Sequence, residues 1–203
     1  VADAAGLRRA ARQLADAAAT GYHIVTVVSA QGKTTDRLLQ TADELTQTPC
    51  CRETDQLLAT GEQASAALMA LTLQQMALPA VSLTGPQAGI HTDGNHGAAE
   101  ITALHRRRIL RELEAGKIVI VAGFQGIDRA GDLTTLGRGG SDTTAVALAA
   151  ALDACGCRIC TDVDGVYSGD PRRNADCQRY DFIPYEEMLE MAKKHNITIL
   201  LSK

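Results

Sequence analysis

The sequence is poor in aromatic residues, which make up 3% of its 203 residues, and it contains no tryptophan. A hydrophobic core must therefore be built mainly from alanine, leucine, valine and isoleucine. No stretch approaches the roughly 20 consecutive apolar residues that a membrane-spanning helix needs. The first residues form an alanine-rich amphipathic segment that does not resemble a signal peptide. We therefore expect a cytoplasmic protein with no membrane partner.

An excess of basic residues is also lacking, since the formal net charge is -4 at pH 7. Proteins that bind nucleic acid or an anionic membrane surface select clustered lysine and arginine. The basic run at residues 106–108 is followed by Ile109, Leu110 and Leu113, a pattern typical of the solvated face of a helix. We therefore expect no nucleic acid partner.

The six cysteines do not form the two well-spaced pairs that a structural zinc site usually needs. Residues 155–160 bring three of them together, but their alternation with other side chains is typical of a short strand. We predict buried, reduced thiols, which fit a cytosolic protein, and no metal-binding residue.

Helical and strand-like segments alternate along the chain. Helices are expected from the start of the chain to Gly21 and at residues 35–45, 55–76, 105–115, 143–154 and 185–195, and strands at residues 23–28, 80–83, 118–122, 158–161 and 197–201. Short strands rich in valine and isoleucine, separated by helices, indicate an α/β fold with a mostly parallel sheet covered on both faces. Ligands of such sheets bind beyond the carboxyl ends of the strands.

The strongest local signal is a glycine-rich segment at residues 134–144, which leads into an apolar helix. Glycines before a helix let the backbone approach a ligand, and the first-turn N–H groups together with the helix dipole favour a bound phosphate. Ser141 is a natural N-cap, and Arg138 could grip a carboxylate with two parallel hydrogen bonds. The spacing fits neither a Walker loop nor a dinucleotide fingerprint.

These residues carry a family resemblance. Residues 137–142, 161–167 and 170–172 resemble the aspartokinase branch of the amino acid kinase family, as do residues 28–32 with 34–36, 59–62, 84–89 and 121–126. The resemblance implies a three-layer α/β/α sandwich with a mostly parallel central sheet, the amino acid kinase or carbamate kinase-like fold. It also implies the transfer of the γ-phosphoryl group of ATP to the β-carboxylate of L-aspartate, the committing step towards lysine, threonine and methionine.

The resemblance also implies roles for residues on the substrate side. Glu62 would hold the ammonium group of aspartate, although a carboxylate that only offsets a helix dipole is the alternative. Arg138 would hold the α-carboxylate, and Asp142 would organise the catalytic lysine and Mg²⁺ around the transferring phosphoryl group. The hydroxyls of Ser29 and Thr35 would complete the pocket, unless they are ordinary capping residues. The remaining substrate-binding positions are Gly139, Gly140 and Ser141.

On the nucleotide side, Thr161, Asp162, Tyr167 and Arg172 match positions that contact ATP in the family. Tyr167 would lie beside the base or sugar, and Arg172 would point towards the phosphates. Residues 170–172 could instead form no more than a rigid turn. The five histidines match no catalytic position and are interpreted as surface or loop residues.

The family pattern includes two lysine-bearing segments that the 203 residues do not contain. One is a Lys-x-Gly-Gly-Thr/Ser strand expected before residue 1, and the other is expected after Ala192. Paired regulatory modules are absent as well, so residues 1–203 are interpreted as one catalytic domain without these parts, and as a dimer by resemblance. The alternatives are another amino acid kinase and a non-catalytic homologue that binds nucleotide or amino acid.

Overall fold

The computed structural model describes residues 3–137, 139–160, 166–167 and 178–184. The chain forms two compact units, residues 1–154 and residues 155–203. The first unit contains a parallel sheet, five helices and a second, mixed sheet, and it carries the candidate site.

The parallel sheet has the strand order β1-β5-β2, with β1 at Val25–Val28, β5 at Ile118–Ala122 and β2 at Ala80–Leu83. The predicted strands at residues 80–83 and 118–122 are confirmed, and the one at residues 23–28 is shorter by two residues at its start. Val28 lies opposite Ala122, and Leu83 lies opposite Val121. All three strands therefore end at the same edge of the sheet.

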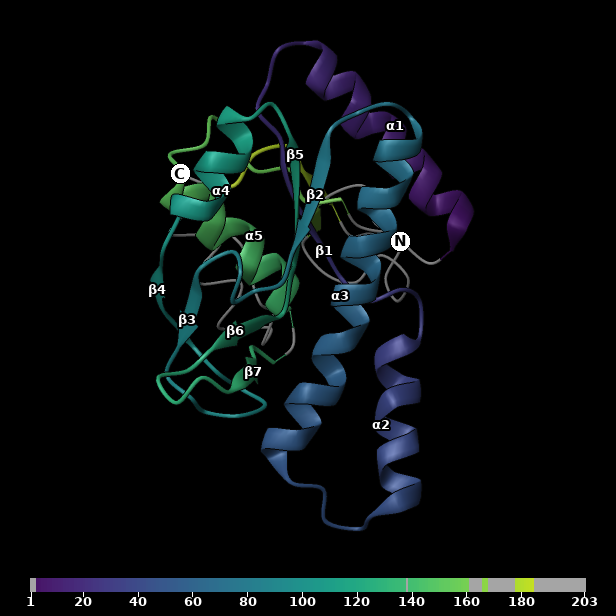
Figure 1. The fold of residues 1–203 in the computed structure, drawn as a ribbon, viewed down its shortest axis with the longest axis vertical. Helices are drawn as coiled ribbons and strands as arrows, with labels where there is room; N and C mark the ends of the chain where they lie inside the picture. The colour runs from purple at the N-terminus through teal and green to yellow at the C-terminus, as the bar shows by residue number, and fades with distance from the viewer. Residues whose placement is uncertain (1–2, 138, 161–165, 168–177, 185–203) are drawn as a thin grey trace. The chain divides into compact units, whose positions relative to one another are not determined.

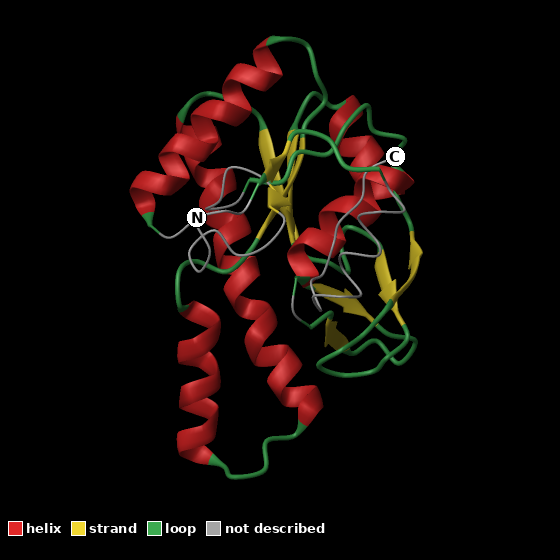
Figure 2. Ribbon diagram, turned by 180° about the vertical axis from the view of Figure 1, so that it is seen from behind, coloured by secondary structure: helices red, strands yellow, loops and turns green. Residues whose placement is uncertain are grey.

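Helices cover both faces of this sheet, with α1 (Ala4–Ala19) and α3 (Cys51–Gln75) on one face and α4 (Arg107–Glu114) and α5 (Gly140–Ala151) on the other (Figures 1 and 2). Every residue of β5 is buried, because its side chains alternate between two cores. Ile118, Ile120 and Ala122 pack with α1 and α3, whereas Val119 and Val121 pack on the opposite face. These layers confirm the predicted α/β/α sandwich.

A second sheet was not predicted. Its order is β4-β3-β6-β7, with β3 at Ile90–Thr92, β4 at Ile101–Leu104, β6 at Gln125–Ile127 and β7 at Leu133–Thr135. The strands are three or four residues long and carry several polar side chains, so the sequence has no alternating apolar pattern that would predict them. Strands β6 and β7 form an antiparallel hairpin that leads from the end of β5 to the glycine-rich loop.

Two helix starts differ from the prediction. Helix α3 begins at Cys51 and not near Asp55, and α5 begins at Gly140 and not at Thr143. The N-cap of α5 is Gly139, so the prediction of Ser141 as N-cap is wrong. Helix α2 (Thr34–Leu45) and helix α4 agree with the expected segments to within two residues, and the arginines at 106–108 are exposed as predicted.

In the second unit, β8 (Val166–Tyr167) pairs with β9 (Arg179–Tyr180) in antiparallel orientation. Residues 158–160 do not form the predicted strand, and the elements predicted at residues 185–195 and 197–201 lie outside the described residues. The prediction of buried thiols is wrong for four of the described cysteines, Cys50, Cys51, Cys155 and Cys160, which are exposed. None of the helices in the described part of the chain is both long and apolar enough to cross a membrane.

Candidate functional site

A cavity of about 540 Å³ opens in the first unit, beyond the carboxyl ends of β1 and β5. This is the edge of a parallel sheet at which ligands are expected. Its walls come from the loop after β1, from helices α2 and α3, and from the glycine-rich loop with the start of α5. The predicted substrate-side residues that line it are Ser29, Thr35, Glu62, Gly139, Gly140, Ser141 and Asp142.

The glycine-rich loop needs its glycines for two different reasons. Gly137 and Gly139 have φ angles of 72° and 73°, a left-handed conformation that other residues rarely adopt. Gly140 packs tightly instead, because a Cβ atom there would lie 2.8 Å from Phe124 Cδ2 and 2.9 Å from Leu136 Cβ. The N–H groups of the first helical turn have no acceptor within a helix, so those of Ser141 and Asp142 can donate to an anion in the cavity.

The end of β5 lies directly against this helix start. A Cβ atom on Gly123 would lie 2.7 Å from the Ser141 hydroxyl oxygen and 2.8 Å from Ser141 Cα. The Phe124 N–H donates to Thr144 Oγ1 at 3.2 Å, and that hydroxyl donates to Gly140 O at 2.7 Å. The sheet edge therefore determines where α5 begins and where its N–H groups point.

Glu62 lies deep in α3, with only 4% of its surface exposed. Its Oε1 accepts a hydrogen bond of 3.0 Å from the Ala30 N–H in the loop after β1. Its Oε2 is buried and has no hydrogen-bond partner among the described residues. Burial raises the pKa of the Glu62 carboxyl, against the opposing effect of the Ala30 hydrogen bond. A cationic group in the cavity would supply the missing partner.

The alternative role of Glu62, offsetting the dipole of α3, is wrong. Helix α3 begins at Cys51, so Glu62 lies about three turns, or roughly 16 Å, from the helix start. The dipole effect falls off within the first turn. Gly61 has a packing reason of its own, since a Cβ atom there would lie 2.9 Å from Ala30 Cβ. The small residue lets α3 approach the loop that contacts Glu62.

The two hydroxyl residues lie at the cavity wall and not at a helix cap. Ser29 follows β1 and is exposed, and Thr35 lies in the first turn of α2 and is half-buried. The N-cap of α2 is Lys33, which is exposed. Neither Ser29 nor Thr35 therefore has the capping role that the sequence left open for them.

Sequence reasoning missed Asp55, a cavity residue in α3 that is only 1% exposed. Its Oδ2 accepts from the Gly97 N–H at 3.1 Å and the Thr135 N–H at 3.0 Å, and it lies 2.8 Å from His96 Nδ1. Its Oδ1 accepts from the Thr135 hydroxyl at 2.6 Å. An acidic residue seven positions before Glu62 was the only signal in the sequence, because its partners lie more than 40 residues away.

Five predicted residues cannot be placed. Arg138, Thr161, Asp162 and Arg172 lie outside the described residues, and only the backbone of Tyr167 is described. The predicted nucleotide side of the site therefore stays a prediction. Among the histidines, His23 is exposed and His96 lies in a loop, but His91 belongs to β3, where its ring lies 4.6 Å from that of His105.

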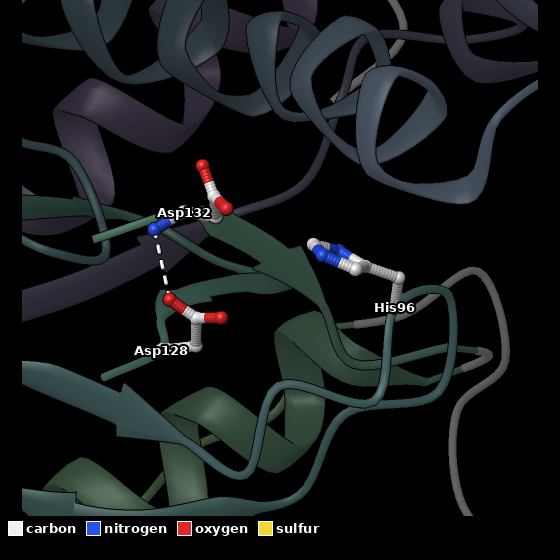
Figure 3. Close-up of side chains that lie close together, drawn as sticks. All are labelled: His96, Asp128 and Asp132. Atoms are coloured by element: carbon white, nitrogen blue, oxygen red, sulfur yellow. Dashed lines mark hydrogen bonds between the residues drawn. The ribbon is translucent and has the colours of Figure 1, made fainter. Parts of the chain in front are cut away.

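His96, Asp128 and Asp132 present one possible metal-ligand atom each within 4.8 Å of one another (Figure 3). Each group is already engaged by the protein. Asp128 Oδ1 accepts from the Asp132 N–H at 2.8 Å, Asp132 Oδ1 accepts from Arg52 Nη2 at 2.6 Å, and His96 Nδ1 lies against Asp55. These internal hydrogen bonds account for the arrangement of the three side chains.

The fold and the cavity define a class: an α/β/α protein with a glycine-rich helix start on one side of a cavity and a buried carboxylate on the other. The chain belongs to the amino acid kinase family, whose family model matches residues 1–202.

The chain is 54% identical over 172 residues to the aspartate kinase Ask_LysC of Stutzerimonas stutzeri (strain A1501). The matched region covers 85% of this chain and 42% of that protein. The structure of aspartate kinase from Synechocystis is 44% identical, with a TM-score of 0.78, over 92% of this chain and 30% of that one. E. coli aspartokinase III in complex with aspartate and ADP is 27% identical, with a TM-score of 0.80, over 95% of this chain and 54% of that one. The chain spans less than half the length of the curated relatives it matches.

Proposed function

We propose that this chain supplies catalytic machinery of an aspartate kinase, which transfers the γ-phosphoryl group of ATP to the β-carboxylate of L-aspartate. The observation that carries the proposal is Glu62, a cavity-lining residue whose Oε2 is buried and lacks a hydrogen-bond partner among the described residues. A buried charge of this kind is stable only when it is paired. The ammonium group of an amino acid is a suitable partner, and similarity to aspartate kinases favours aspartate.

In this proposal aspartate lies across the cavity. Its ammonium group donates to Glu62, and its α-carboxylate pairs with Arg138, which belongs to the glycine-rich loop. Ser29 and Thr35 offer hydroxyl donors at the wall between them. This orientation leaves the β-carboxylate free to reach the start of α5, where Gly139, Gly140 and Ser141 lie.

The phosphoryl group is transferred at the start of α5. An oxygen of the β-carboxylate forms a bond to the γ-phosphorus, and the bond to the β–γ bridging oxygen breaks, so that ADP carries away the electron pair. The protein must chiefly align the two anions and stabilise their charge. First-turn N–H groups of α5 face the phosphates, and Asp142, exposed in that turn, could hold Mg²⁺ bound to ATP. Thr161, Asp162, Tyr167 and Arg172 contact the nucleotide in this proposal.

The wider setting follows from the same proposal. Residues 1–203 act as catalytic domain of a longer protein that supplies the two lysine-bearing segments and the regulatory modules. The enzyme is a cytoplasmic dimer and catalyses the first step towards lysine, threonine and methionine. The similarity to aspartate kinases over most of the chain supports this setting.

The experiment that tests the function uses the full-length protein, ATP and Mg²⁺, and traps the acyl phosphate product with hydroxylamine. Aspartate is compared with glutamate, N-acetylglutamate and a nucleoside monophosphate, with ADP release as the readout for acceptors that form no hydroxamate. We expect product with aspartate only. Turnover of another acceptor would replace aspartate as the substrate, and nucleotide binding without turnover of any acceptor would make the protein a non-catalytic homologue.

A further inference from the structure

Asp55 and Glu62 belong to the same face of α3, because seven residues correspond to about two helical turns. Both are almost fully buried, at 1% and 4% exposure. Their surroundings differ in one respect. Glu62 has one oxygen without a hydrogen-bond partner among the described residues, whereas both oxygens of Asp55 accept hydrogen bonds from the protein. Asp55 is therefore poorly suited to bind a ligand itself.

The hydrogen bonds of Asp55 lead directly to the glycine-rich loop. Thr135 donates to Asp55 from both its N–H, at 3.0 Å, and its hydroxyl, at 2.6 Å. Thr135 is the last residue of β7, two positions before Gly137. From the other side, Gly97 and His96 contact the same carboxylate, and the Ala99 N–H donates to Thr135 O at 2.9 Å. Thr135 is thus held on its side chain and on both backbone polar groups.

Helix α3 also holds the β6–β7 hairpin through two further sets of side-chain contacts. Arg52, three residues before Asp55, donates to Asp132 from Nε at 3.0 Å and from Nη2 at 2.6 Å. Gln125 donates to Ala59 O at 3.0 Å and accepts from Gln63 Nε2 at 3.1 Å. The first half of the helix that carries Glu62 is therefore hydrogen-bonded to the hairpin that leads into the glycine-rich loop, and the two elements lie side by side in Figure 1.

Asp55 differs from the Arg52–Asp132 pair in its burial, and from Gln125, which is equally buried, in the hairpin residue that it holds. Arg52 and Asp132 are partly exposed, with side-chain exposures of 41% and 33%, so their ion pair is screened by water. Gln125 lies opposite Thr135 in the hairpin but belongs to β6, whereas Asp55 contacts Thr135 itself, the last residue of β7. An error in the position of Thr135 is transmitted directly to the loop that follows it.

We propose that Asp55 is a positioning residue that sets the glycine-rich loop at the correct distance from Glu62, and so aligns the amino acid with the phosphoryl group. This proposal rests on the proposed function. Misplacement of reacting groups by about 1 Å can reduce a rate on the order of 100-fold. A residue that aligns the substrates without binding them should affect kcat much more than KM.

The test is Asp55→Asn in the full-length protein. The amide oxygen can still accept from Thr135 N–H and Gly97 N–H, and the Thr135 hydroxyl can rotate to accept from the amide nitrogen. The variant therefore removes the charge and weakens the bonds without opening a void. Two controls accompany it. Glu114→Gln changes an exposed carboxylate on α4, and Ile120→Val removes a buried methyl group from β5 and lowers stability without contact to the loop.

Two measurements are made on each variant. Hydrogen–deuterium exchange should become at least about tenfold faster at residues 134–142 in Asp55→Asn, with unchanged protection at residues 118–122. In steady-state kinetics, kcat should fall roughly 10- to 100-fold, with KM for aspartate and ATP changed by less than about threefold. Glu114→Gln should match the wild type in both, and Ile120→Val should keep its kcat.

Three results would overturn the proposal. One is normal exchange with kcat within about twofold of the wild type. Another is a loss of kcat with unchanged exchange at residues 134–142, which would mean that Asp55 acts elsewhere. The third is equal loss of protection at the loop and at β5, which would make Asp55 a general stabilising residue. If the wild type does not phosphorylate aspartate, the proposed function fails, and exchange still shows whether Asp55 positions the loop.

Discussion

Replacing Glu62 with glutamine is the perturbation that separates binding of an amino acid from stability of the fold. The amide keeps the size of the side chain, and its oxygen can still accept from the Ala30 N–H, now 3.0 Å from Oε1. The change removes only the negative charge at Oε2, which is buried and has no partner among the described residues. An ammonium group of the substrate would then face a neutral amide, whose NH₂ is itself a donor.

The expected loss follows from the burial of the pair. Truncating one partner of a buried, hydrogen-bonded charge pair costs about 2–5 kcal/mol. We expect the lower part of this range, about 2–3 kcal/mol, because the other contacts to aspartate remain, and this corresponds to a Kd raised roughly 30- to 200-fold. Isothermal titration calorimetry of the full-length protein with aspartate, and separately with ADP, measures it. ADP affinity should stay within about twofold, because Glu62 lies on the amino acid side.

The same variant should differ from the wild type in how its folding stability depends on pH. Burial raises the pKa of Glu62, so the folded state binds more protons than the unfolded state between the ordinary glutamate pKa and the raised value. Wild-type stability therefore falls as pH rises through that interval, whereas Glu62→Gln has no such loss. Urea denaturation at acidic and neutral pH should show the variant gaining on the wild type as pH increases. Unchanged aspartate affinity in Glu62→Gln would refute the assignment of Glu62 to the ammonium group.

Three further predictions concern stability and packing. The cationic neighbours of Glu112, chiefly Lys117, lower the pKa of its carboxyl to about 2. The contribution of ionised Glu112 to folding stability should therefore persist at neutral pH and disappear as pH falls towards that value. Urea midpoints should show the wild type losing its stability advantage over Glu112→Gln as pH falls. Gly61→Ala places a Cβ atom 2.9 Å from Ala30 Cβ. The overpacking cost of about 1–3 kcal/mol should outweigh the gain of ~1 kcal/mol in helix propensity, so the variant should be less stable than the wild type. A higher urea midpoint in the variant would contradict this. Gly139 has a φ of 73°, so Gly139→Ala should lower the free energy of unfolding by about 1–2 kcal/mol and weaken ADP binding. Urea denaturation and calorimetry measure the two effects. A urea midpoint and an ADP Kd equal to those of the wild type would show that the loop tolerates a side chain.

The parallel sheet was predictable because its information is local. Strands β2 and β5 are short runs of valine, isoleucine, leucine and small residues, and β5, which is buried at every position, is apolar at every position. The glycine-rich loop was predictable for a similar reason, since adjacent glycines, a serine and an acidic residue before an apolar helix form a pattern within a few residues. The α/β class and the edge of the sheet that carries the cavity followed from these two signals.

The second sheet and the hydrogen bonds of Asp55 could not be predicted in this way. Strands β3 and β6 pair through His91 and Ile127, which are far apart in the chain, and three-residue strands show no measurable period. The burial of Asp55 depends on Thr135, which lies 80 residues away. Neither contact can be predicted from the residues that flank it in the sequence.

The sequence by itself determined the α/β class, the parallel strands, the glycine-rich entry to a helix and the family, because each depends on residue types at short spacing. Only the tertiary structure decided that Glu62 is buried in the middle of α3 with one oxygen that has no partner among the described residues, and that Asp55 joins this helix to Thr135, which leads into the glycine-rich loop. Burial and hydrogen bonding between distant segments depend on how helices and hairpins pack together. They are properties of the folded chain and not of any single segment.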